Sequence, residues 1–147
     1  MRDFEKTINH KISQIPTNNY KDLEKAIIKQ RISWARQHRQ PAESNATPRE
    51  AYEMLFFEIM KLDPAGVTVL SDNDQKITWS STNTCDTLEA CLRTGNDTRI
   101  ACQEIYEKST QALVSELDPQ IRFYRSYDEI RPYSHQCLEW LIRMDFQ

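Results

Sequence analysis

The sequence predicts an α+β domain: N-terminal helices followed by a mainly antiparallel sheet with two helices packed on it. Apolar residues recur at helical spacing in the first third of the chain, alternate with polar residues just afterwards, and alternate again at the end. With 147 residues, 39% of them hydrophobic and 28% charged, the chain has the size and composition of one globular domain. We therefore expect a single domain over 1–147, with a helical lead-in at 1–66 and a strand–helix–strand core at 67–147.

Two helices are expected in the lead-in. The first covers 20–40, and its apolar face would consist of Leu23, Ala26, Ile27 and Trp34. The second opens at Thr47, whose hydroxyl can accept from the backbone of Glu50 while the Glu50 side chain reaches back, and Pro48 suits the first helical position. The turn residues 63–66 end it. Its buried side would hold Tyr52, Leu55, Phe56 and Ile59.

Four strands are expected in the core. Segments 67–70 and 77–79 flank the polar turn 71–74 and predict a hairpin. Segments 121–125 and 137–144 predict a closing pair of strands. Side chains alternate across a strand, so one face of the last strand would carry Cys137, Glu139, Leu141 and Arg143.

Two helices are expected between these pairs of strands. Asp86 and Glu89 match a capping box that opens a short helix, and Gly95 ends it. Asp97 can cap a longer helix that runs to Leu117. The inward face of the longer helix would hold Ala101, Ile105, Ala112 and Leu113.

The charge pattern excludes several classes of function. The net charge is −3 and basic residues are interleaved with acidic ones, so we expect no nucleic-acid partner. No apolar run approaches the roughly 18 residues of a membrane span, and the N-terminus lacks the apolar core of a signal peptide. We therefore expect a cytoplasmic protein with no membrane partner and with its four cysteines reduced. Two disulfides are the alternative.

Cys85 is the first candidate for thiol chemistry. It follows a strand-like segment and comes just before a predicted helix, where exposed amides and the helix dipole favour a thiolate. The alternative is a small apolar residue at a corner of the fold. Cys102, within the long helix, is a candidate partner for Cys85 or an inert buried thiol. Cys91 is expected in the core.

The last strand offers a second group of candidates. Cys137 and Glu139 share a strand face, and a helix facing them could bring Cys102 close. Zinc accepts thiolate and carboxylate ligands, so Cys85, Cys102 and Cys137 are candidate ligands for zinc or iron, although the chain contains no Cys-x-x-Cys motif. His135 has the same strand parity as Cys137 and could activate a cysteine, with a solvated turn histidine as the alternative.

Arginines and tyrosines cluster before the last strand and suggest how a ligand could be held. Arginine is a planar, permanently charged group that suits a carboxylate. Arg125, Arg131 and Tyr127 are the candidate substrate-binding residues. Pro132 gives Arg131 an extended backbone that could aim its side chain inward. A solvated strand edge paired with nearby acids is the alternative reading.

The order of these motifs over residues 67–145 resembles the L-2-amino-thiazoline-4-carboxylate hydrolase family. Members typically show a cysteine after a strand, another in the long helix, a P-x-(I/L)-x-F-x-R strand and a closing cysteine. The layout is also similar to 4-vinyl reductase-like domains, which bind small ligands. The motifs that carry the resemblance are Asn83-Thr84-Cys85, Cys91, Asp97–Cys102, Pro119–Arg125 and Cys137.

The resemblance implies a hydrolase that cleaves a cyclic C–N or C–S bond in a small carboxylate-bearing compound. Cys85 and Cys102 would then lie closest to the reaction, and Arg125 would hold the substrate carboxylate. Glu139 or His135 could serve as the base.

Two alternatives of other classes stay open. One is a non-catalytic binding module, a sensor like the 4-vinyl reductase domains, whose pocket would be lined by some of the aromatic residues Trp79, Phe123, Tyr124, Tyr127 and Trp140. The other is a structural protein whose cysteines are core residues. In that case the helix at 20–40, with Trp34, would dock a partner or form a homodimer.

Overall fold

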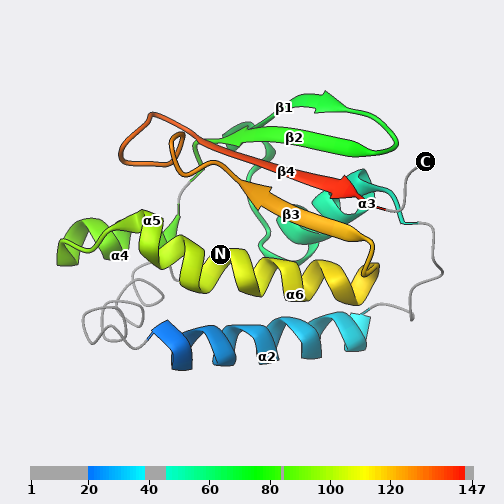
Figure 1. Ribbon diagram of the computed structural model, residues 1–147, viewed down its shortest axis with the longest axis horizontal. Coiled ribbons are helices and arrows are strands. Elements are labelled where there is room, and N and C mark those ends of the chain that lie inside the picture. The colour runs from blue at the N-terminus through cyan, green and yellow to red at the C-terminus, as the bar shows by residue number, and fades with distance from the viewer. Residues whose placement is uncertain (1–19, 39–45, 84, 145–147) are drawn as a thin grey trace.

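The computed structural model describes residues 20–38, 46–83 and 85–144 and confirms the expected α+β fold class. One antiparallel sheet has the strand order β1-β2-β4-β3 (Figure 1). Its strands are β1 (Val67–Asp72), β2 (Lys76–Ser81), β3 (Ile121–Arg125) and β4 (Cys137–Arg143). The part of the predicted lead-in before residue 20 lies outside the described residues.

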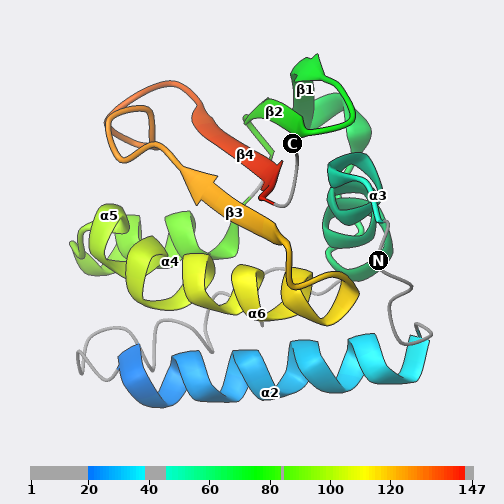
Figure 2. The same cartoon turned by 45° about the vertical axis from the view of Figure 1, so that its right-hand side comes forward.

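The helices lie on one side of this sheet. From the N-terminal side they are α2 (Tyr20–His38), α3 (Pro48–Glu53), the π-helical η2 (Met54–Ile59) and the 3₁₀ turn η3 (Pro64–Gly66). After the β1–β2 hairpin come α4 (Asp86–Thr94), α5 (Thr98–Ala101), the π-helical η4 (Cys102–Glu107) and α6 (Lys108–Leu117). The helix α2 packs along the outer side of α6, away from the sheet (Figure 2).

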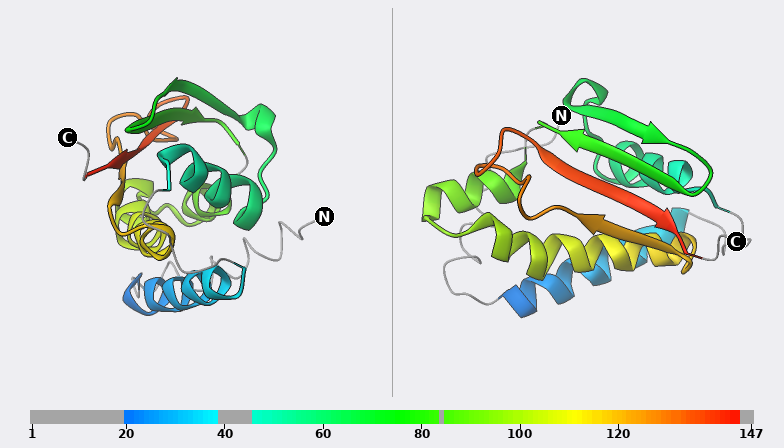
Figure 3. Two further views of the ribbon diagram at one scale, coloured as in Figure 1. Left: turned by 90° about the vertical axis from the view of Figure 1, so that its right-hand side faces the viewer. Right: turned by 45° about the horizontal axis from the view of Figure 1, so that its top comes forward.

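The last strand of the chain lies in the middle of the sheet. β4 pairs with β2 on one side and with β3 on the other, and all three pairings are antiparallel (Figure 3). In this register Glu139 stands opposite Trp79 of β2 and opposite Arg125 of β3. Side chains that face each other across strands point to the same side of a sheet. The topology therefore sets a tryptophan, a glutamate and an arginine in one row on the inner face.

An aromatic cluster fills the space between the sheet and the helix formed by α3 and η2. Trp79 is fully buried, and its ring centroid lies 5.1 Å from those of Tyr52 and Phe56. Trp34 of α2 is half-buried and packs against the same core. Burying aromatic side chains on this scale is a main source of stability for a domain of this size.

Local sequence signals explain most of the helix boundaries. The Thr47 hydroxyl accepts from the Glu50 backbone at 3.1 Å, as predicted, and the Glu50 carboxylate accepts from that same hydroxyl at 3.3 Å. Asp97 caps the long helix by accepting from the Arg99 backbone at 2.8 Å. Gly95 ends α4 with a left-handed φ of 72°, a conformation that favours glycine.

Two details of the predicted helices were wrong. The N-cap of α4 is Cys85, whose sulfur accepts from the backbone of Leu88, and Asp86 is the first helical residue. The long helix is not regular, because its backbone widens to a π-helical turn at η4, which includes Cys102. Extra residues inserted in a helical turn of this kind often mark functional sites. Within the described residues, no helix is both long and apolar enough to cross a membrane.

Candidate functional site

A pocket of about 50 Å³ lies where β3 and β4 meet the starts of α4 and α5 and the η4 turn. Six of the residues singled out in the sequence line it, namely Cys85, Cys102, Arg125, Arg131, Cys137 and Glu139. They come from four separate parts of the chain. The fold therefore brings together the cysteines, the arginines and the glutamate that the sequence suggested.

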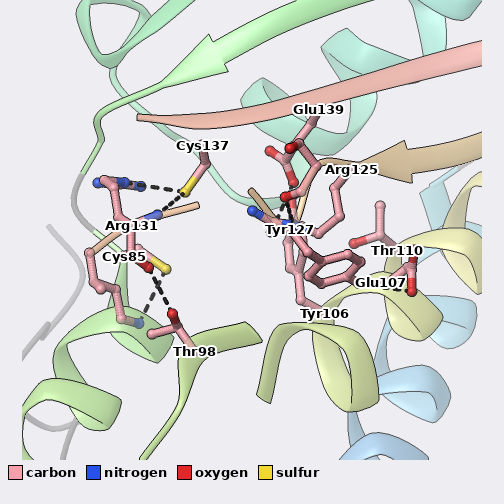
Figure 4. Close-up of polar contacts among 12 residues, drawn as sticks. Cys85, Thr98, Tyr106, Glu107, Thr110, Arg125, Tyr127, Arg131, Cys137 and Glu139 are labelled. Atoms are coloured by element: carbon pink, nitrogen blue, oxygen red, sulfur yellow. Dashed lines mark hydrogen bonds and ion pairs between the residues drawn. The ribbon is translucent and has the colours of Figure 1, made fainter. Parts of the chain in front are cut away.

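Arg131 and Cys137 form the outer part of the pocket. The Arg131 backbone N–H and its Nε both donate to the sulfur of Cys137, at 3.4 and 3.3 Å (Figure 4). The same guanidinium donates through its NH1 nitrogen to the carbonyl of Asn83 at 2.6 Å. Arg131 therefore holds the β2–α4 connection and the start of β4 together, and two of its polar groups face Cys137 rather than a ligand.

Cys85 lies on the same outer side and is half-buried. Its sulfur accepts from the Leu88 backbone at 3.5 Å and caps α4. The N-terminal end of a helix favours negative charge. Cys85 therefore has the setting of a nucleophilic thiol that the sequence predicted, and it occupies the cap position itself.

Arg125 and Glu139 form the floor of the pocket. They make an ion pair at 3.5 Å, and their side chains are only 3% and 4% exposed. The indole nitrogen of Trp79 donates to Oε1 of Glu139 at 3.2 Å. Burial raises the pKa of Glu139 above its usual value, and the charge of Arg125 only partly opposes this.

Two polar atoms of this floor lack hydrogen-bond partners among the described residues. They are the NH2 nitrogen of Arg125 and Oε2 of Glu139, and both are buried. The ion pair brings Oε2 within 3.5 Å of the NH1 nitrogen of Arg125 but without the geometry of a hydrogen bond. Buried polar groups are almost always paired, so these two atoms are available to a bound ligand or water.

Cys102 forms part of the wall between the floor and the outer cysteines. Burial raises the pKa of its thiol far above the usual value, and Arg125 only partly opposes the effect. Cys102 therefore stays a neutral thiol at physiological pH. Tyr106 lies one helical turn further along η4, also lines the pocket, and burial raises the pKa of its hydroxyl as well.

The arrangement of the thiols gives no support to the expected zinc or iron site. Within the described ranges, no group of three or more His, Cys, Asp or Glu side chains is placed to hold a metal ion. The Arg131 guanidinium at the sulfur of Cys137 would also repel a cation.

Two predicted site residues lie outside the pocket lining. His135 is exposed in the loop before β4, not on the strand, so its presumed strand parity with Cys137 was wrong. Tyr127 donates from its hydroxyl to Glu107 at 3.0 Å and places its ring 5.7 Å from the Arg125 guanidinium. Tyr127 therefore supports Arg125 rather than binding a substrate itself.

Tyr106 and Thr98 are among the pocket residues that sequence reasoning missed. Tyr106 follows Cys102 by four residues, and that spacing places both on one helix face, which is a signal the sequence did contain. Thr98 lines the pocket and donates from its hydroxyl to the Arg131 carbonyl at 2.8 Å, a contact between segments 33 residues apart that no local pattern indicates.

Comparisons of the chain with protein-family models, with curated proteins and with solved structures find no match.

Proposed function

We propose that this protein is a thiol-dependent hydrolase that opens a cyclic C–N or C–S bond in a small carboxylate-bearing compound of the thiazoline-carboxylate type. One observation carries the proposal: a buried arginine, Arg125, has an unpartnered NH2 nitrogen at the floor of a pocket whose outer side carries Cys85. A guanidinium is suited to a carboxylate, and a thiol at a helix N-terminus is suited to nucleophilic attack.

The size of the pocket sets the orientation of the substrate. An enclosed cavity of about 150 Å³ can bind benzene, whereas this pocket measures about 50 Å³ and opens to solvent. We therefore place the carboxylate beside Arg125 and the ring toward the opening. The ring then lies further out, toward the half-buried Cys85 and Cys137. This orientation would place the ring carbon between the thiols of the outer side and Glu139 of the floor.

The proposed reaction has two steps. The Cys85 thiolate adds to the carbon of the ring C=N bond, whose electron pair moves to nitrogen and takes up a proton. The nitrogen lone pair then re-forms the C=N bond as the ring C–S bond breaks, and the ring sulfur leaves as a thiolate that takes up a proton. Water next attacks the same carbon and displaces the Cys85 sulfur, so that one water is consumed for each ring opened.

Glu139 is the candidate base for the attacking water. Burial raises its pKa, which makes the carboxylate a better proton acceptor than an exposed one. None of the histidines in the described ranges lines the pocket, and His135 is exposed. The base that the sequence left open between Glu139 and His135 is therefore proposed to be Glu139.

The test uses L-2-amino-thiazoline-4-carboxylate and follows the thiol released when the ring opens. The variant Cys85→Ser should reduce turnover to background, because a hydroxyl at this position is a far weaker nucleophile. The matched control is Cys91→Ser, since Cys91 is buried beside Ala90 and Ala101 and does not line the pocket. Undiminished turnover by Cys85→Ser, or a loss as large in Cys91→Ser, would contradict the mechanism.

A second candidate function is a non-catalytic sensor of small carboxylates. It is favoured by the protonated state of Cys102, which removes the predicted partner of Cys85. The same substrate would then raise the thermal midpoint of unfolding without release of a thiol. Thiol release that depends on Cys85 would reject the sensor.

A further inference from the structure

We infer that Glu139 selects ligands that carry an N–H group on the atom next to their carboxylate, so that the floor of the pocket recognises α-amino and related carboxylates rather than plain carboxylates. The inference rests on the proposed function, because it takes the carboxylate to be held by Arg125. It adds a specificity role for Glu139 in which Oε2, the oxygen not bonded to Trp79, accepts from the ligand before it acts as the base.

The first argument is the pair of unpartnered atoms. The NH2 nitrogen of Arg125 can only donate, and Oε2 of a carboxylate such as Glu139 can only accept. They belong to residues that are directly opposite on neighbouring strands. A ligand that satisfies both must present an acceptor beside a donor. A carboxylate with a neighbouring N–H group does so, and a plain carboxylate leaves Oε2 unsatisfied.

The second argument is the charge of the floor. Arg125 and Glu139 form one buried pair with no net charge, at 3.5 Å. A plain carboxylate would bring a negative charge close to Glu139 in a buried place, where repulsion is weakly screened. A zwitterionic head group adds no net charge, and each of its poles meets the opposite charge. At the Arg125–Glu139 pair, electrostatics favour the same ligand class as the hydrogen-bond inventory, while Arg131 adds a positive charge at the outer part of the pocket.

The third argument is that neighbouring side chains hold the pair in place. Trp79 donates to Oε1 of Glu139 at 3.2 Å, which occupies that oxygen and leaves Oε2 for a ligand. The ring of Tyr127 lies 5.7 Å from the Arg125 guanidinium. A preorganised donor and acceptor discriminate more sharply between ligands than mobile groups do, because less ordering is needed on binding.

The experiment titrates the wild-type protein with L-alanine, propionate and L-alanine methyl ester, which differ only in the amino group or in the free carboxylate. The indole N–H resonance of Trp79 is the reporter, because that group donates to Glu139. We expect L-alanine to bind at least tenfold more tightly than either analogue. Equal affinity for L-alanine and propionate would overturn the inference but would leave the proposed binding of the carboxylate by Arg125 intact. No binding by L-alanine or propionate would overturn both.

A variant pair separates selectivity from simple loss of charge. Glu139→Gln keeps the shape but removes the negative charge that the ammonium group needs, so the preference for L-alanine over propionate should fall to less than threefold. The control is Glu129→Gln, which makes the same charge change at an exposed position that accepts from Gln136. An unchanged preference in Glu139→Gln would overturn the inference. If that variant does not fold, the wild-type titration decides alone.

Discussion

The variant Arg125→Met is expected to be strongly destabilised, by about 3–5 kcal/mol, because it leaves the carboxylate of Glu139 buried without its partner. The two charges are 3.5 Å apart and their side chains are 3% and 4% exposed. At an effective dielectric constant of about 20, such a pair attracts by about 5 kcal/mol. Methionine fills a similar volume, so the loss of charge rather than a cavity dominates the change.

The free energy of unfolding that Arg125→Met loses should depend on pH in a defined direction. Burial already raises the pKa of Glu139 in the wild-type protein, and without Arg125 the pKa rises further. Between the pKa of the unfolded state and the higher pKa of the folded state, the folded protein binds more protons than the unfolded chain. The free energy of unfolding of Arg125→Met therefore falls as the pH rises through that window, by up to about 1.4 kcal/mol for each pH unit.

Urea unfolding followed by far-ultraviolet circular dichroism at several pH values tests this reasoning. The double variant Arg125→Met with Glu139→Gln is the control, since it removes both charges while the glutamine oxygen can still accept from Trp79, and it should unfold within about 1–2 kcal/mol of the wild type. A loss below about 1 kcal/mol in Arg125→Met with no pH dependence would refute the buried pair.

Three further predictions follow from local geometry. Gly66→Ala should lower the free energy of unfolding, measured by heat or urea, by about 1–3 kcal/mol, because the added Cβ would lie 2.9 Å from the backbone of Asn83. An unfolding midpoint equal to that of the wild type would mean that this close approach does not exist. Gly95→Ala should lower the free energy of unfolding by about 1 kcal/mol because Gly95 has a left-handed φ of +72°, although no atom lies within 4 Å of the added Cβ. A stabilised variant would contradict the left-handed cap. Iodoacetamide followed by peptide mass spectrometry should modify Cys137 well before Cys102, since burial both shields the Cys102 thiol and raises its pKa; modification of Cys102 first would mean that the inner wall is open.

Sequence reasoning located the elements whose boundaries depend on nearby residues. The capping contact between Thr47 and Glu50, the cap at Asp97 and the stop at Gly95 are all made within a few residues, so they can be read from the chain alone. The bounds of the strand Ile121–Arg125 were also predicted correctly, because the alternation of apolar and polar residues along a strand can be read from the sequence.

Predictions failed where a neighbouring segment decides the local structure. Either Cys85 or Asp86 can start α4, and only the folded chain shows that Cys85 takes the cap. The spacing of Cys102 and Tyr106 predicts that both lie on one helix face, but no periodicity of the sequence indicates that the helix widens to the π-helical η4 turn at these residues. Of the two readings of His135, the structure agrees with the solvated turn histidine, because the strand begins at Cys137 and His135 is exposed before it.

The sequence by itself determined the fold class and the types of residue in the site: thiols, arginines and one acidic residue on a predicted strand face. Only the tertiary structure decided which of them act together. β4 lies between β2 and β3, so Glu139 meets both Trp79 and Arg125 from strands that are far apart along the chain. The two unpartnered atoms of the floor exist only because this packing excludes other donors and acceptors, and burial of that kind is a property of the folded chain.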